Sequence, residues 1–176
     1  MFGLFEKRRK RGRENAAAPR VAEDMRVYAI GDVHGRLDLL KKLSGKISED
    51  RAANPAARYK LIFLGDYVDR GNQSRELLDL LSEGPIDGFE TIYLSGNHEE
   101  FLLRFLSDTS DASSWLYYGG ANTLISYGIS ASPLQNDPER LIAIQQKFRD
   151  VLPESMFLAR LAGDEFAVLV TDQFSV

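Results

Sequence analysis

The chain has 176 residues, of which 44% are hydrophobic and 27% charged, a composition typical of a water-soluble globular protein with a single core. It contains no cysteine, which excludes disulfides and thiolate metal sites, so any metal must be held by oxygen and imidazole ligands. No apolar run approaches the roughly 20 residues of a membrane-spanning helix. The first residues also lack a signal-peptide core, so we expect a cytoplasmic protein.

Charge is distributed unevenly along the chain. The first 20 residues carry a net charge of +5, and the remainder carries −9. Residues 1–24 have no apolar period, which predicts a flexible basic arm, followed by one domain over residues 25–176. A weak contact between this arm and an anionic surface is one interpretation, and a solubilising tail is the simpler one.

Three units, each a β-prone run followed by an apolar helical pattern, come after the arm. Strands that alternate with helices in this way predict an α/β fold with a mostly parallel sheet. The strands are expected at residues 26–30, 59–64 and 91–94, and the helices around residues 37–47, 77–81 and 101–106.

The last third of the chain is less regular. Residues 115–128 are rich in aromatic residues and glycine, which predicts a packed region of loops and helices. Asp137 and Pro138 are typical of a helix start, and we expect this helix to end before Pro153. Residues 158–170 are expected to form a β-hairpin that turns at residues 163–164.

A short polar motif stands at the predicted end of each of the first three strands. The motifs are GDVHG at residues 31–35, GDYVDRG at 65–71 and GNHE at 96–99, and they contain both histidines of the chain. The carboxyl ends of parallel strands lie on one edge of a sheet, so we expect the motifs to converge there. A single Gly-Asp pair after a strand is usually only a turn, but three such motifs in series indicate a functional site.

The residue types in these motifs suit phosphate chemistry. Carboxylates and imidazoles bind Mn, Fe or Zn ions, and a carboxylate such as that of Asp66 can bridge two of them. Two metals polarise a phosphoryl group and lower the pKa of a bound water, which then attacks as hydroxide. Arg70 or Arg36 would hold phosphate oxygens in a guanidinium fork. His98, oriented by Asp69, would protonate the leaving alkoxide; a plain surface ion pair of Asp69 with Arg70 is the alternative.

In this order, the three motifs resemble the signature of the PPP-type metallophosphatases. This calcineurin-like family includes Ser/Thr protein phosphatases and symmetrical dinucleoside tetraphosphate hydrolases. The resemblance runs from about residue 26 to 153 and implies the first half of a calcineurin-like αββα sandwich. The residues that it implies are Asp32, His34 and Asp66 for the first metal, Asp66 and Asn97 for the second, His98 and Asp69 for the acid pair, and Arg70 and Arg36 for phosphate.

The resemblance also implies an activity. This would be hydrolysis of phosphate monoesters by metal-bound hydroxide, as in bacterial phosphoserine and phosphothreonine protein phosphatases. The substrate would be a phosphorylated protein or a small phosphoester, and the cofactors would be two divalent ions, either Mn, Fe or Zn. The alternatives are a fragment that binds only metal or phosphate, and a dinucleoside tetraphosphate hydrolase.

The sequence departs from the family pattern after His98. The family supplies two further histidines to the second metal, and no histidine follows here, so the second metal site is expected to be incomplete. Residues 158–170 instead resemble the GGDEF signature of diguanylate cyclases, although so short a segment cannot form a cyclase domain. A truncated or chimeric reading frame would explain both features, and we expect the C-terminal half of the phosphoesterase domain to be incomplete.

Overall fold

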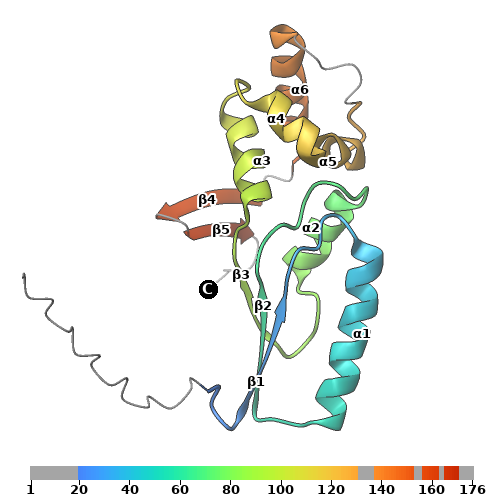
Figure 1. The fold of residues 1–176 in the computed structure, drawn as a ribbon, viewed down its shortest axis with the longest axis vertical. Helices are drawn as coiled ribbons and strands as arrows, with labels where there is room; N and C mark the ends of the chain where they lie inside the picture. The colour runs from blue at the N-terminus through green and yellow to red at the C-terminus, as the bar shows by residue number, and fades with distance from the viewer. Residues whose placement is uncertain (1–19, 131–136, 153–155, 163–164, 171–176) are drawn as a thin grey trace, which may run out of the picture.

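The computed structural model describes residues 20–130, 137–152, 156–162 and 165–170, the last two segments as backbone only. The predicted arm, apart from residues 20–24, and the predicted turn at 163–164 lie outside this part of the chain. Figure 1 shows a small sheet with two helices beside it and a group of further helices beyond the end at which its strands finish. None of the described helices is long and apolar enough to cross a bilayer.

The sheet contains β1 (Met25–Ile30), β2 (Arg58–Phe63) and β3 (Glu90–Tyr93) in the order β1-β2-β3. Both pairings are parallel, which confirms the predicted α/β fold with a parallel sheet. Ile30, Phe63 and Tyr93 lie in register at the carboxyl edge. Each polar motif follows one of these residues closely, so all three motifs leave the sheet at the same edge.

A helix follows each of these motifs: α1 (Leu37–Ala53), α2 (Ser74–Glu83) and α3 (Asn97–Ser107). Beyond α3 come α4 (Ala112–Trp115), the π-helical turn η1 (Leu116–Gly120), α5 (Ala121–Ser126) and α6 (Pro138–Val151). The Asp137 carboxylate caps α6 by accepting a hydrogen bond from the Arg140 backbone N–H at 3.1 Å, so this predicted helix start is confirmed. The last two strands, β4 (Met156–Ala162) and β5 (Glu165–Val170), pair antiparallel, as predicted.

The core lies on one face of the sheet. Leu61 and Phe63 of β2 are fully buried, whereas the alternate residues Lys60 and Ile62 remain partly exposed, as expected for a strand covered on one side. The apolar faces of the helices complete this core, and the buried indole of Trp115 extends it into the helical group.

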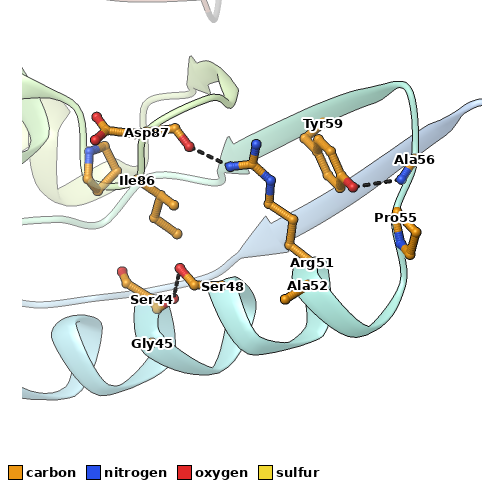
Figure 2. A pocket seen from close by; sticks show the side chains of 11 residues that line it. Ser44, Gly45, Ser48, Arg51, Ala52, Pro55, Ala56, Tyr59, Ile86 and Asp87 are labelled. Atoms are coloured by element: carbon orange, nitrogen blue, oxygen red, sulfur yellow. Dashed lines mark hydrogen bonds between the residues drawn. The ribbon is translucent and has the colours of Figure 1, made fainter.

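At the amino-terminal edge of the sheet, Arg51 of α1 ties the helix to the strands (Figure 2). Its guanidinium donates to the Asp87 carbonyl at 2.7 Å and lies over the rings of Tyr59 and Phe89, 4.6 and 5.2 Å from their centroids. Arg51, Tyr59 and Asp87 line an open hollow of about 820 Å³. The hollow is therefore part of the scaffold at the end of the sheet opposite the three motifs.

Candidate metal centre

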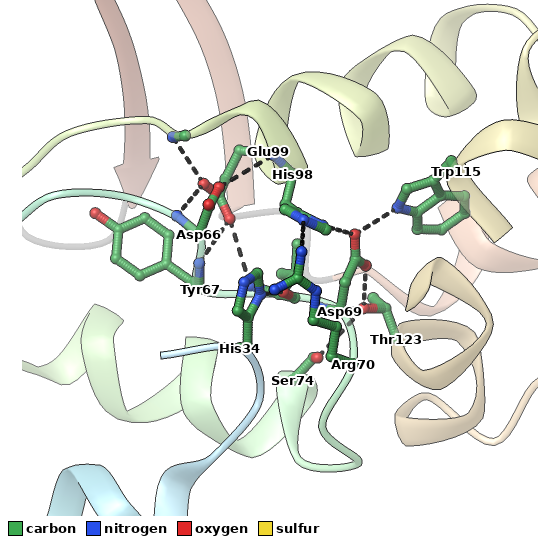
Figure 3. Close-up of polar contacts among 12 residues, drawn as sticks. His34, Asp66, Tyr67, Asp69, Arg70, Ser74, His98, Glu99, Trp115 and Thr123 are labelled. Carbon is green, nitrogen blue, oxygen red and sulfur yellow. Dashed lines mark hydrogen bonds and ion pairs between the residues drawn. The ribbon is translucent and has the colours of Figure 1, made fainter. Parts of the chain in front are cut away.

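The three motif loops meet at the carboxyl edge of the sheet. The backbone N–H groups of Val33 and His34 donate to the Asp66 carbonyl at 3.0 and 2.9 Å, which joins the first loop to the second. His34, Asp66 and His98 each offer a potential ligand atom, and these atoms all lie within 4.8 Å of one another. Figure 3 shows the three side chains converging from separate loops.

The backbone at this edge is held in an unusual conformation. His34, Asp66, Asp69 and Arg70 have φ angles of 46°, 55°, 72° and 65°, which lie in the left-handed region that non-glycine residues rarely adopt. Such conformations cost free energy and cluster at functional sites, where the surrounding structure enforces them. Together these loops therefore form a strained and well-defined edge.

His34 has one ring nitrogen available for a metal ion. Its Nδ1 lies 2.8 Å from the Val68 carbonyl, which can only accept, so Nδ1 carries the proton and donates. Its Nε2 is buried and has no hydrogen-bond partner among the described residues. The Asp32 carboxylate, which is 66% exposed, lies 3.8 Å from this nitrogen. A buried nitrogen lone pair beside carboxylates suits a divalent ion, so the residues present fit a metal site.

Asp66 contributes a carboxylate to the cluster. Its Oδ1 accepts a hydrogen bond from the His98 backbone N–H at 3.2 Å. Gly96 packs so closely that a Cβ atom there would lie 2.0 Å from the same oxygen. The position of the Asp66 carboxylate therefore depends on the absence of a side chain at residue 96.

Glu99 holds the second and third loops together, a role that the sequence analysis did not assign. Its Oε2 accepts from the N–H groups of Asp66 and Gly96 at 2.7 and 2.9 Å, and its Oε1 accepts from those of Tyr67 and Val68 at 2.8 and 3.3 Å. Burial raises the pKa of the Glu99 carboxyl, and these amide hydrogen bonds oppose the rise. Glu99 is the third residue of α3, where a glutamate often caps a helix start, but the sequence predicts this helix only around residues 101–106 and so gives Glu99 no such role.

Asp69 and His98 form a buried pair. Their Oδ2 and Nδ1 atoms lie 2.7 Å apart, and Asp69 also accepts from the Trp115 Nε1–H at 2.9 Å and the Thr123 hydroxyl at 2.7 Å (Figure 3). Burial raises the pKa of the Asp69 carboxyl, against the effect of the hydrogen bonds from Thr123, His98 and Trp115. The alternative of a surface ion pair with Arg70 is wrong, because Asp69 is fully buried.

Arg70 contacts the other side of the His98 ring. Its guanidinium lies 3.1 Å from the Nε2 atom of His98, and because a guanidinium can only donate, that nitrogen accepts. Both ring nitrogens of His98 thus have protein partners. His98 is therefore better placed to transfer a proton than to bind a metal, although its Nε2 lies near enough for either role.

Two predicted residues stand apart from this cluster. The Arg36 guanidinium forms two 2.8 Å hydrogen bonds with Asp38 and lowers the pKa of that carboxyl to about 2. Asn97 is exposed at the start of α3, and among the described residues its side chain has no hydrogen bond. The phosphate role of Arg36 and the metal role of Asn97 stay predictions.

Trp115 and Thr123 were also missed as site residues. The sequence predicts only a packed region of loops and helices there, and the two residues lie 46 and 54 positions beyond the Asp69 that they contact. No local pattern signals a contact over such a separation.

Comparison with known proteins indicates a single family. A family model described as calcineurin-like phosphoesterase matches residues 25–157. The asymmetrical bis(5'-nucleosyl)-tetraphosphatase PrpE of Bacillus cereus strain Q1 is 32% identical over 146 residues, which cover 79% of this chain and 58% of the relative. Its counterpart from Bacillus thuringiensis strain Al Hakam has the same identity and coverage. The chain thus spans somewhat more than half the length of these relatives.

Proposed function

Because this chain belongs to the calcineurin-like phosphoesterase family, we propose that it hydrolyses phosphate esters or anhydrides where His34, Asp66 and His98 meet. The observation that carries the proposal is the buried Nε2 of His34, which has no hydrogen-bond partner among the described residues and lies near the carboxylates of Asp32 and Asp66. We assign His34 and Asp66 to metal binding, with Asp32 at the rim of the site and Asn97 as a further candidate. A bound divalent ion would polarise the phosphoryl group and lower the pKa of an attacking water.

Arg70 would bind the phosphate of the substrate. A phosphate oxygen is a stronger acceptor for a guanidinium than a neutral imidazole nitrogen, so we expect Arg70 to turn from His98 Nε2 toward the substrate. This movement frees Nε2 to carry a proton. Arg70 would then have two effects, since it holds the phosphate and releases His98 for catalysis.

His98 would act as the general acid. Asp69 fixes its ring through Nδ1, so Nε2 can face the leaving oxygen of the substrate. As the oxygen of the attacking water bonds to phosphorus, the bond from phosphorus to the leaving oxygen breaks and that oxygen takes the Nε2 proton. The proton lost by the attacking water passes to solvent, and His98 is reprotonated from solvent.

A nucleoside polyphosphate is the substrate class that we favour. The relatives at 32% identity are named as bis(5'-nucleosyl)-tetraphosphatases, and the match covers 79% of this chain. Protein phosphatase activity, a metal that is Mn, Fe or Zn, and a cytoplasmic location stay predictions. So does the incomplete second metal site, because the chain aligns with only 58% of the relative's length.

A turnover assay with metal analysis tests this function. The purified chain is loaded with manganese and given para-nitrophenyl phosphate and diadenosine tetraphosphate, with Asp66→Asn and His98→Ala as variants. We expect turnover that both substitutions abolish, and bound metal that is lost in Asp66→Asn but retained in His98→Ala. Elemental analysis gives the number of metal ions per chain. Two ions would show that the second metal site is occupied, and one ion would show that it is incomplete. Metal binding without turnover would instead support the non-catalytic fragment.

A further inference from the structure

A cluster of aromatic rings lies exposed on the helical group. Tyr117 and Tyr118 of η1 are 83% and 54% exposed, and their rings pack edge to face with centroids 5.3 Å apart. The Tyr118 ring lies nearly parallel to that of Phe101 on α3, with 16° between their planes and 6.4 Å between their centroids. We refer to Phe101, Tyr117 and Tyr118 as the aromatic platform.

The platform adjoins the proposed phosphate site. Tyr118 directly precedes Gly119, whose carbonyl accepts a hydrogen bond from the Arg70 backbone N–H at 3.2 Å. Gly119 has a φ of 118°, and a Cβ atom there would lie 2.7 Å from the Arg70 nitrogen. The η1 turn is thus pressed directly against Arg70. Phe101 lies three residues beyond His98 on α3, so the platform begins within about one helical turn of His98.

Tyr117 and Tyr118 are exposed, whereas Phe101 is partly buried and packs against the core. Single exposed apolar residues are common, but touching aromatic rings beside a polar site are typical of a ligand surface. In the same region, Trp115 and Tyr127 are buried, so the fold has room for aromatic side chains in its core. The two exposed tyrosine rings therefore offer apolar faces on the turn whose backbone contacts that of Arg70.

A ligand that fits this arrangement combines an anionic phosphate with a planar ring. A nucleotide has both, and aromatic side chains bind nucleobases by stacking with little dependence on the base, because every base has a π-face. We propose that Tyr118 and Tyr117 stack on a nucleobase of a nucleoside polyphosphate whose phosphate is held by Arg70. The proposal rests on the proposed function and adds the feature that selects the substrate. The two tyrosines determine specificity and are not catalytic residues.

Steady-state kinetics on two substrates tests the platform. Diadenosine tetraphosphate has bases and phosphoanhydrides, whereas inorganic tripolyphosphate has only the phosphoanhydrides. We expect Tyr118→Ala to lower kcat/KM for diadenosine tetraphosphate by roughly 5- to 150-fold, mainly through KM, and to leave tripolyphosphate unchanged. Tyr117→Ala should give a smaller loss of the same kind. Tyr118→Phe keeps the ring and should restore most of the activity, and Ile142→Ala is a control that removes an exposed apolar side chain elsewhere.

Two outcomes would overturn the platform while the proposed function stands. These are an unchanged kcat/KM for diadenosine tetraphosphate in Tyr118→Ala, or an equal loss on tripolyphosphate. If the wild-type chain hydrolyses none of these substrates, the proposed function fails, and calorimetry with ADP and pyrophosphate tests the platform alone. ADP binding at least fivefold tighter than pyrophosphate, with the difference lost in Tyr118→Ala, supports it; equal affinities overturn it.

Discussion

At the scale of single residues, the orientation of His98 is the main chemical feature of the site. Asp69 accepts a hydrogen bond from the Nδ1–H of His98, and Arg70 donates a hydrogen bond to its Nε2. One partner on each side of the ring therefore sets the tautomer. Asp69 in turn is held by Trp115 and Thr123, which leaves its carboxylate little freedom to move. The His98 ring, which we propose as the general acid, is thus positioned by a chain of hydrogen bonds rather than by one contact.

Asp69→Asn should lower kcat by about 10²- to 10⁴-fold, the range of one general acid. An asparagine amide placed opposite Nδ1 favours the wrong tautomer of His98, although the side-chain volume hardly changes. Single-turnover rates with para-nitrophenyl phosphate and a thermal melt measure the two effects separately. Trp115→Phe removes only one of the donors to Asp69 and should cost much less. An Asp69→Asn variant that is folded and fully active would refute the role of Asp69.

At the scale of secondary-structure elements, the site depends on how closely the strand-end loops approach one another. A Cβ atom on Gly65, which has a φ of 105°, would lie 2.3 Å from the Gly96 nitrogen, so the second and third loops meet through two glycines. Glu99 then joins these loops by accepting their amide hydrogen bonds. The first turn of α3 is therefore a structural clamp as well as the element that carries His98.

Glu99→Gln should lower the free energy of unfolding by about 1–3 kcal/mol, because an amide nitrogen would face two backbone donors and leave them unsatisfied. Urea denaturation with a folded-state probe measures this change. Glu100→Gln is the matched control on the same helix. Glu100 forms a half-exposed ion pair with Arg104, so its loss should cost only a few tenths of a kcal/mol. Equal stabilities of the two variants would show that Glu99 is no clamp.

Gly96→Ala should lower kcat/KM by roughly 10²-fold, since the added Cβ would displace the Asp66 carboxylate and misplaced groups of this kind cost about that much. Gly31→Ala is a suitable control, because a Cβ atom at residue 31 would meet nothing within 4 Å. Kinetics of both variants, together with their manganese content, test the difference. Were Gly96→Ala to keep wild-type activity and metal content, the close packing on Asp66 would have no functional role.

At the scale of the whole molecule, the two edges of the sheet serve different purposes. The amino-terminal edge is tied to α1 by Arg51, with its guanidinium over Tyr59 and Phe89. The carboxyl edge carries strained loops, and the buried Nε2 of His34 has no hydrogen-bond partner there within the part of the chain that the structure describes. The amino-terminal edge therefore stabilises the fold. The carboxyl edge contains strained backbone, which lowers stability, at a site that a bound ion would complete.

Manganese should raise the stability of the folded chain. A ligand that binds only the folded state contributes about 2.7 kcal/mol when its concentration is 100 times its Kd, so the melting temperature should increase with metal concentration. Differential scanning calorimetry measures the shift, and a chelator should reverse it. Asp66→Asn should remove most of the shift. A melting temperature that manganese leaves unchanged, at concentrations that saturate activity, would argue against metal binding by the folded chain.

The amino-acid sequence by itself determined the strand and helix units, the parallel sheet and the convergence of the three motifs. Each depends on local periodicity, or on the rule that parallel strands end on one edge, as the alignment of Ile30, Phe63 and Tyr93 shows. Only the tertiary structure decided the tautomer of His34 and the burial of Asp69 beneath Trp115 and Thr123. These features depend on which distant segments pack together, and the free energy of that packing has no periodic signature in the chain.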